Sequence, residues 1–480
     1  MIQKILTSIK ISLLCLIILL PGAFTARAQQ VITLQKAVAL TLERNLTIKQ
    51  SKLTEALGAE DVRQAKANQL PTLSVNPQAS YSFGRSPNLT TYSYTSQSFL
   101  YVNAQASLGV NLFQGGQLRN QVLENKLILD ADKTSTEKVK NDLLLNVVVD
   151  YLQILTNQDL VSAANQQIDI AKITLDRAQK NFNAGNQTLA DLSQAKAGLS
   201  TAELNLTTAQ NQLASTLLTL KQYMEMNPDS DITIEKPDIS KLTNIRLAFD
   251  ENEVVNTAMQ HYPDVRLAEI QQKGYEQAIK VAKGYYYPTL SLFGGLGTNY
   301  SSISQNVTGV VTSTQQIGVV QGTNTPVVTS IQQPVYASSY GLGSQFNNNF
   351  NQSFGLSLQI PIFNHSTASV AVKKAKLNYE YSELTTQLAK DNLSKTIAQA
   401  LLDLKAAEKS YISAQQTYEA DKEAFNTVKQ RYDVGLVNSL DYNTSLTNYN
   451  KAENDMITAK YTLVFRSKVI DYYLGNPIQL

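Results

Sequence analysis

The sequence has very little cysteine and histidine, the side chains that most often bind zinc. It contains one cysteine, two histidines and no tryptophan. Cys15 lies in an apolar segment near the start of the chain, so the rest of the chain can form no disulfide. His261 and His365 have no cysteine or carboxylate cluster at the spacing of metal ligands. There is no glycine-rich phosphate loop either, and we therefore expect no metal, no cofactor and no enzymatic activity.

Charged residues are also scarce, and their signs nearly balance. They make up 17% of the chain, and the formal net charge is only +2. A protein that binds nucleic acid needs a basic surface to contact the phosphates. The charge balance therefore predicts no nucleic-acid partner.

Residues 1–28 have the pattern of a signal peptide. Lys4 and Lys10 precede an apolar run at 11–20, and Ala26-Arg27-Ala28 has the small residues that signal peptidase requires. The run is shorter than the ~20 residues that a membrane-spanning helix needs, which favours a signal peptide over an N-terminal membrane anchor. We expect an exported protein with no transmembrane helix after the signal.

Proline and glycine are nearly absent from the stretch Gln117–Met224. It contains no proline, and its only glycines are Gly185 and Gly198. Inside a helix proline costs about 3 kcal/mol and glycine about 1 kcal/mol, so their absence permits very long helices. Gly185 lies in a short polar interruption. We therefore predict a helical hairpin over 117–224, whose longer arm would measure roughly 100 Å.

Before this hairpin the hydrophobic period changes from that of a helix to that of a strand. Apolar residues recur at helical spacing over 33–68, with a break near Asn45. Two segments, at about 72–83 and 101–112, then alternate apolar and polar residues. Alternation over about ten residues fits a transmembrane β-barrel, but an exposed sheet on a soluble core has the same pattern.

The second half of the chain repeats the first. Pro71-Thr-Leu-Ser returns 217 residues later at Pro288, whereas the turn glycine Gly185 returns 250 residues later as Gly435. Self-similarity at such spacing indicates a duplicated structural unit. The change in offset predicts an insertion between the second pair of strands.

The repeat also predicts how the chain is divided. The insertion is the uncharged stretch 301–349, which we interpret as an extracellular loop. The predicted segments, in order, are a first repeat at 31–227, a connector at 228–250, and a second repeat at 251–475 with strands at about 289–300 and 350–360 and a helical hairpin at 366–474.

Four strands cannot close a membrane barrel, because a barrel needs at least about eight to leave no unpaired edge in lipid. Two chains would supply eight strands, but an eight-stranded barrel is filled by its own side chains. Three chains would supply twelve strands. We therefore predict a mixed α+β fold that assembles as a homotrimer, with a 12-stranded transmembrane β-barrel and a periplasmic α-helical barrel.

The order of elements and four motifs resemble the TolC-type outer-membrane efflux channels, the outer membrane factors. The motifs are the strand-to-helix segments Leu108–Gly116 and Leu356–Phe363 and the turns Asn181–Gly185 and Arg431–Gly435. The resemblance implies a homotrimeric exit duct in the cell outer membrane that extends into the periplasm. It also implies docking to a periplasmic adaptor (membrane fusion protein) and to an inner-membrane transporter of the RND or ABC class. The alternative is a periplasmic coiled-coil adaptor or scaffold, which would have one hairpin beside soluble β-domains.

The candidate functional residues lie at the two helical turns, around Gly185 and Gly435, where an adaptor would dock. Thr188-x-x-Asp191 and Asn438-x-x-Asp441 are both N-cap patterns with an acidic residue in the first turn of a helix. Capping alone is sufficient to account for these residues.

The resemblance adds a gate to this capping role. By the resemblance, Asp441 matches the first aspartate of an acidic ring at the periplasmic entrance, and Thr444 replaces the second. Tyr432 matches a tyrosine that latches the closed tip, whereas Val437 occupies the position of the latch arginine. The resemblance therefore implies a polar lock that is weaker here, or one that uses Asn438 or Asp191 instead.

Overall fold

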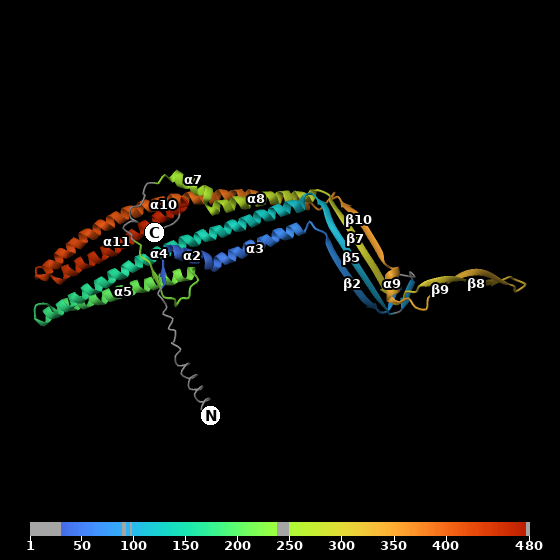
Figure 1. The fold of residues 1–480 in the computed structure, drawn as a ribbon, viewed down its shortest axis with the longest axis horizontal. Helices are drawn as coiled ribbons and strands as arrows, with labels where there is room; N and C mark the ends of the chain where they lie inside the picture. The colour runs from blue at the N-terminus through green and yellow to red at the C-terminus, as the bar shows by residue number, and fades with distance from the viewer. Residues whose placement is uncertain (1–29, 89–92, 97, 238–248, 477–480) are drawn as a thin grey trace, which may run out of the picture. The chain divides into compact units, whose positions relative to one another are not determined.

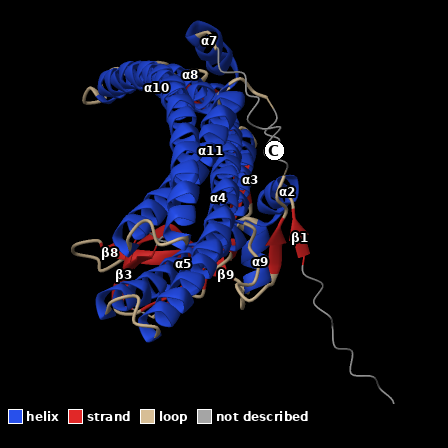
Figure 2. Ribbon diagram, turned by 90° about the vertical axis from the view of Figure 1, so that its left-hand side faces the viewer, coloured by secondary structure: helices blue, strands red, loops and turns tan. Residues whose placement is uncertain are grey.

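The computed structural model describes residues 30–88, 93–96, 98–237 and 249–476, so the predicted signal peptide at 1–28 lies outside it. The chain divides into two compact units, whose helices and strands are drawn in Figures 1 and 2. Unit 1 consists of Met1–Glu55, Ala131–Glu269 and Thr385–Leu480, and unit 2 of Ala56–Asp130 and Ile270–Leu384. Each unit contains parts of both predicted repeats. The compact units therefore do not follow the predicted repeat boundaries.

Four long helices contain 204 of the 480 residues. Helices α4 (Gln117–Asn183) and α10 (Thr367–Asp433) each have 67 residues, and α5 (Leu189–Tyr223) and α11 (Ser439–Tyr473) each have 35. The absence of proline allows these lengths. None of the helices within the described ranges combines the length and the apolar character needed to cross a membrane.

The first two of the shorter helices are separated by a capping residue. The predicted break near Asn45 is confirmed, because α2 (Leu34–Arg44) and α3 (Leu46–Ala67) are separate helices. The Asn45 side chain accepts a hydrogen bond from the Thr47 N–H at 2.9 Å, which caps α3. In the second half, α7 (Glu251–His261) is followed by α8 (Pro263–Lys283) and the 3₁₀ turn η1 (Gly284–Tyr286).

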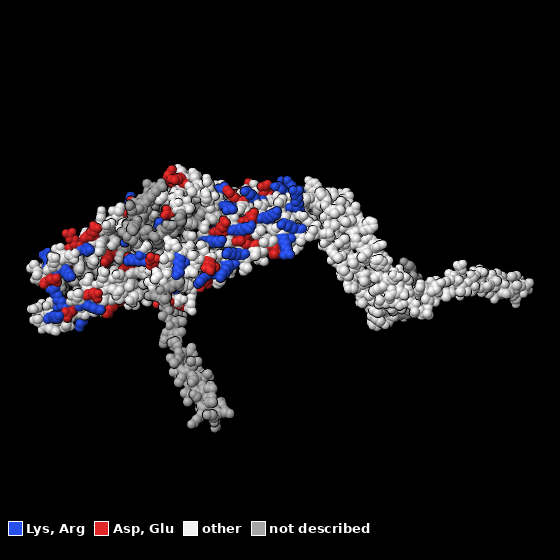
Figure 3. All heavy atoms as spheres, in the orientation of Figure 1, with Lys and Arg blue, Asp and Glu red and all other residues white. Residues whose placement is uncertain are grey.

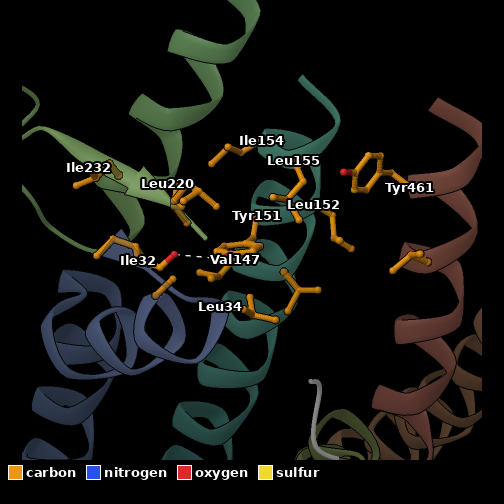
Figure 4. Close-up of a cluster of buried hydrophobic side chains, with 14 of the residues drawn as sticks. Ile32, Leu34, Val147, Tyr151, Leu152, Ile154, Leu155, Leu220, Ile232 and Tyr461 are labelled. Carbon is orange, nitrogen blue, oxygen red and sulfur yellow. Dashed lines mark hydrogen bonds between the residues drawn. The ribbon is translucent and has the colours of Figure 1, made fainter. Parts of the chain in front are cut away.

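The core of unit 1 surrounds Tyr151 on α4, as Figure 4 shows. The Tyr151 hydroxyl donates to the carbonyls of Ile32 at 3.2 Å and Glu235 at 2.8 Å, so this buried polar group is paired. Strands β1 (Gln30–Ile32) and β6 (Ile232–Ile234) form a small parallel sheet. Ile32 is the last residue of β1, and Glu235 directly follows β6. The segment 228–250 was predicted as a plain connector. That prediction was incomplete, because residues Ile232–Ile234 of this segment form strand β6, which pairs with β1 and contributes to the core.

Unit 2 contains a four-stranded antiparallel sheet in the order β10-β7-β5-β2. The strands are β2 (Thr72–Ser82), β5 (Phe99–Gln114), β7 (Thr289–Ser301) and β10 (Asn351–Gln359). They lie where the alternating pattern indicated strands, except that β5 extends two residues further at each end than the predicted 101–112. A short hairpin of β3 (Arg85–Asn88) and β4 (Ser93–Ser96) follows β2.

The segment 301–349, predicted as a loop, contains regular structure instead. It forms a β-hairpin of β8 (Val307–Val319) and β9 (Pro326–Tyr336), followed by the short helix α9 (Leu342–Asn348). Valine and threonine favour strands, and Gly322 turns the chain at φ +98°. Buried Gln345 of α9 binds the backbone N–H and carbonyl of Ser301, which attaches α9 to the end of β7.

The change from β5 to α4 requires glycine. Gly115 and Gly116 have φ angles of +56° and +71°. A Cβ atom on Gly115 would lie 2.6 Å from the carbonyl oxygen of Gly284, which no side chain could tolerate. At the matching corner before α10, His365 and Ser366 take φ angles of +52° and +62° without glycine. His365 therefore occupies a strand-to-helix corner, as the sequence indicated.

Candidate functional site

The two turns that join the long helices have the same backbone geometry. Gly185 and Gly435 adopt φ angles of +77° and +80°, a region that L-residues with a side chain disfavour. At each turn the N–H of the glycine bonds to the carbonyl three residues earlier, and the next N–H bonds five residues back. This is the Schellman pattern, which ends a helix and pairs its free carbonyls. The glycines therefore define the two tips of unit 1.

The helices that leave the tips are capped as the sequence predicted. Thr188 accepts from the Asp191 N–H at 3.2 Å, and the Asp191 carboxylate accepts from the Thr188 N–H at 3.0 Å, which completes a capping box. At the second tip, Asn438 Oδ1 accepts from the Asp441 N–H at 2.8 Å. Capping thus employs Thr188, Asp191 and Asn438 and leaves the Asp441 carboxylate exposed to solvent.

Asp191 also connects the two hairpins. Its carboxylate accepts a hydrogen bond from the hydroxyl of Ser439, the first residue of α11. The bonds from Ser439 and then from Thr188 hold the pKa of Asp191 below its usual value, so the group is ionised at neutral pH. A link between hairpins through Asp191 is one of the two possibilities that the sequence left open.

An aromatic cluster lies behind the second tip. Phe425, Tyr432 and Tyr442 are all buried, and the rings of Tyr432 and Tyr442 stack with centroids 4.5 Å apart and planes 24° apart. Tyr449 extends the stack against Phe425. Val437 packs against this cluster. Val437 is therefore an apolar side chain in an apolar contact.

The cluster is bound to the first hairpin through Tyr442. Its hydroxyl lies 3.2 Å from Thr174 Oγ1 on α4, and Ile170 of the same helix packs against the rings. Burial raises the pKa of Tyr442, so the hydroxyl stays protonated and able to donate.

Arg177, near the end of α4, places a positive charge beside Tyr432 and Asp433. Its guanidinium donates to the carboxylate of Asp433, to the Asp433 carbonyl at 2.7 Å and to the Tyr432 carbonyl at 3.1 Å. The guanidinium carbon also lies 4.8 Å from the centroid of the Tyr432 ring, within cation–π range. Gln187 of the first turn donates to the Tyr432 hydroxyl at 3.1 Å. Tyr432 is therefore held by stacking, by a cation and by two hydrogen bonds.

The structure brings some of the predicted residues together and separates others. Tyr432 and Val437 lie in the aromatic cluster, and Asp191 lies in the link to Ser439. Asp441 is exposed, and Thr444 is also exposed and donates to the Leu440 carbonyl of its own helix at 2.9 Å.

Sequence reasoning missed Arg177, Asp433, Ser439 and Gln187. The sequence pointed only to Asn438 and Asp191 for the polar lock, and neither is a cation. Arg177 lies six residues before the end of α4. From there its long side chain reaches the backbone at the end of α10. Arg177 lies eight residues before Gly185 and Asp433 two residues before Gly435, so no shared spacing from the turns indicated this pair. Within the described residues, no group of three or more His, Cys, Asp or Glu side chains is positioned to hold a metal ion.

Known proteins share this chain's sequence pattern and fold. The sequence model of the outer membrane efflux protein family matches residues 37–224 and 254–476. Outer membrane protein TolC of Salmonella enteritidis is 22% identical over 441 residues, which cover 90% of this chain and 79% of that protein.

Solved structures show the same fold. The CmeC outer membrane channel of Campylobacter jejuni superposes with a TM-score of 0.72 at 19% identity, over 92% of this chain and 85% of that one. CusC superposes with a TM-score of 0.74 at 16% identity, over 92% of both chains. These relatives are channels, which argues against the alternative of a periplasmic adaptor. The chain belongs to the outer membrane efflux protein family, and it is a non-enzymatic efflux channel protein of the cell outer membrane that extends into the periplasm.

Proposed function

We propose that the chain forms the exit duct of a tripartite efflux or secretion system, as a homotrimer with a 12-stranded membrane barrel. The observation that carries this proposal is the four-stranded sheet of unit 2, whose strands contain no charged residue. Large apolar side chains of β10 are exposed on it, including Phe354 at 91%, Leu356 at 64% and Leu358 at 60%. Alternating apolar residues of this kind are typical of strands that face lipid.

The edges of the sheet support closure by other copies of the chain. Each of β2 and β10 pairs with a single neighbour among the described strands. An unpaired strand edge is too costly to leave in lipid. Because all neighbouring strands are antiparallel, β10 and β2 run in opposite directions. β10 of one copy can therefore pair antiparallel with β2 of the next, and three copies close the ring.

The tips of unit 1 suit the docking of a periplasmic adaptor, which would couple the duct to an RND or ABC transporter. The turns around Gly185 and Gly435 carry exposed large apolar side chains, which are unusual on a free surface: Leu189 at 63%, Val434 at 70%, Leu436 at 68% and Leu440 at 65%. Contact with an adaptor would cover them. The duct itself conducts its substrates passively.

The contacts of Arg177 and Asp191 provide a latch for the closed duct. Arg177 binds α4 to the end of α10, and Asp191 binds the start of α5 to the start of α11. Both contacts join the two hairpins of one chain close to the tips. Separating the hairpins would break both, so adaptor binding must offset their loss. Exposed Asp441 would then line the entrance that opens.

Cell fractionation and mass measurement test the duct. The protein should be found in the outer-membrane fraction and, in detergent, should have the mass of three chains by light scattering. Its mobility in gel electrophoresis should change on heating, as is typical of barrels that resist detergent. A monomer or dimer in detergent would contradict the twelve-stranded ring.

A further inference from the structure

Charge is distributed unevenly along unit 2. The strands β2, β5, β7 and β10 contain no charged residue, and the helices that adjoin them begin or end with basic residues alone. Segments 62–69, 117–123, 277–284 and 365–379 together hold no acidic residue. Their eight basic residues, which we name the basic collar, are Arg63, Lys66, Arg119, Lys280, Lys283, Lys373, Lys374 and Lys376. Figure 3 shows lysine and arginine gathered on the helices next to the uncharged sheet.

The basic collar is solvent-exposed and poorly neutralised. All eight side chains belong to exposed residues. Among the described residues, ion pairs involve only two of them: Arg63 with Glu60 at 3.3 Å, and Lys280 with Glu276 at 3.4 Å. Each pair joins two exposed side chains of the same helix, and an ion pair of this kind contributes little to stability. The remaining six charges are available to an external anion.

Exposed aromatic and apolar residues separate the basic collar from the sheet. Tyr285, Tyr286 and Tyr287 follow Lys283 directly and are 47%, 54% and 55% exposed. After β10, Ile362 and Phe363 are 96% and 78% exposed and precede the lysines of α10. The order from apolar strand through exposed aromatic residue to lysine therefore occurs on two separate segments, with tyrosine on the first and Phe363 on the second. Tyrosine and lysine anchor proteins at the boundary between hydrocarbon and water.

We propose that the basic collar binds the phosphates of anionic phospholipids in the membrane leaflet next to the helices. This inference rests on the proposed function, in which the sheet crosses the membrane. A lysine near an anionic membrane surface strengthens binding about fivefold, and the effect extends over one Debye length, about 10 Å at 0.1 M salt. The basic collar would fix the depth of the sheet in the bilayer and select anionic lipid around the duct.

The test counts bound lipid on the full-length protein. The protein in non-ionic detergent is titrated with phosphatidylglycerol or with phosphatidylcholine, and bound lipids are counted by native mass spectrometry. The collar variant carries Lys373→Gln, Lys374→Gln and Lys376→Gln. The matched control carries Lys395→Gln, Lys405→Gln and Lys409→Gln, which neutralise three exposed lysines further along the same helix.

We expect the wild type and the control to bind phosphatidylglycerol in preference to phosphatidylcholine. In the collar variant this preference should be at least about fivefold smaller. Salt at 0.5 M should remove the preference, and inorganic phosphate at the lipid concentration should not. Equal preference in the collar variant and the wild type would overturn the proposal, as would an equal loss in the control.

Insertion into nanodiscs of phosphatidylcholine alone separates this proposal from the proposed function. If the wild type inserts into these nanodiscs but shows no preference for phosphatidylglycerol in the detergent titration, the basic collar alone is overturned. Failure of the wild type to insert would overturn the membrane-spanning sheet and the basic collar together.

Discussion

Arg177 and Tyr432 lie on different helical hairpins, and the guanidinium carbon of Arg177 is 4.8 Å from the centroid of the Tyr432 ring. The same guanidinium donates to the Tyr432 carbonyl at 3.1 Å. One side chain of the first hairpin thus contacts both the ring and the backbone at the end of α10. This relationship connects the two halves of the chain at the tips, and it is the central element of the proposed latch.

The Asp191–Ser439 bond should add to the latch independently of capping. Ser439→Ala removes the link between hairpins and leaves the Thr188–Asp191 capping box intact. A hydrogen bond to a charged group contributes about 1.5–3 kcal/mol, and less when exposed, so we expect about 1 kcal/mol and a fivefold larger open fraction. The measurement is the sensitivity of cells to a large antibiotic that intact outer membranes exclude.

Thr188→Ala is the matched control for Ser439→Ala. It removes the cap of α5, at a cost of about 1 kcal/mol in helix stability, and retains the bond from Ser439. Cells carrying it should keep wild-type resistance. Equal sensitivity of both variants would mean that tip stability, rather than the link, sets the barrier.

Asp441 should bind divalent cations at the entrance. Its carboxylate is exposed, and a symmetric trimer would bring three copies around one axis. Asp441→Asn should therefore weaken block of the channel by divalent cations in planar bilayers by about tenfold or more, because it removes the charge and keeps the shape. Asp441→Glu should retain the block. Block that is unchanged in Asp441→Asn would remove this residue from the gate.

Asp150 on α4 should make stability depend on pH. Burial raises its pKa from 3.8 to about 6, and its Oδ2 atom is buried with no hydrogen-bond partner among the described residues. The folded state therefore binds this proton more tightly than the unfolded state, and stability falls as pH rises from about 4 to 6. After discounting for partial exposure, Asp150→Asn should stabilise the protein by about 1 kcal/mol at pH 7.5.

Thermal unfolding at two pH values checks this effect of Asp150. The melting temperature of Asp150→Asn should exceed that of the wild type at pH 7.5. The difference should shrink to about a third at pH 4.5, where the carboxyl is protonated in the folded state but still largely ionised in the unfolded state. An advantage of equal size at both pH values would show that burial of the charge is not its cause.

The turn glycines should be sensitive to substitution in a way that a helix glycine is not. Gly435→Ala places a side chain at φ +80° and should cost about 1–2 kcal/mol. Gly198 lies inside α5 with open space around its Cα, so Gly198→Ala should instead stabilise by about 1 kcal/mol. Unfolding followed by circular dichroism distinguishes the two, and a Gly435→Ala protein as stable as the wild type would contradict the strained turn.

Much of the fold could be predicted from the sequence because its signals are local and strong. The proline-free stretches and turn glycines indicated the helices, since a single proline would have broken them. Alternating apolar residues likewise indicated the four strands of the sheet. The β8–β9 hairpin was missed because its valines do not alternate strictly with polar residues. Strand β6 was missed because three residues are too few to show a period.

The candidate site could be predicted only in part. Tyr432 and Asp191 were found because they lie at repeated motifs or at caps. Arg177 was missed, because its partner Asp433 is 256 residues away in the chain and no local pattern connects them. Its role depends on how two long hairpins pack against each other, which the sequence does not state.

The conductance of single channels in planar bilayers tests the latch most directly. Arg177→Ala removes the cation, the ring contact and the bonds to Tyr432 and Asp433 in one change. Lys180→Ala is the control, because within the described part of the chain Lys180 forms an ion pair only with Asp176 of its own helix, at 2.6 Å. The latch predicts a severalfold larger conductance for Arg177→Ala and a wild-type conductance for Lys180→Ala. Conductance of Arg177→Ala equal to that of the wild type would contradict a tip held closed by Arg177.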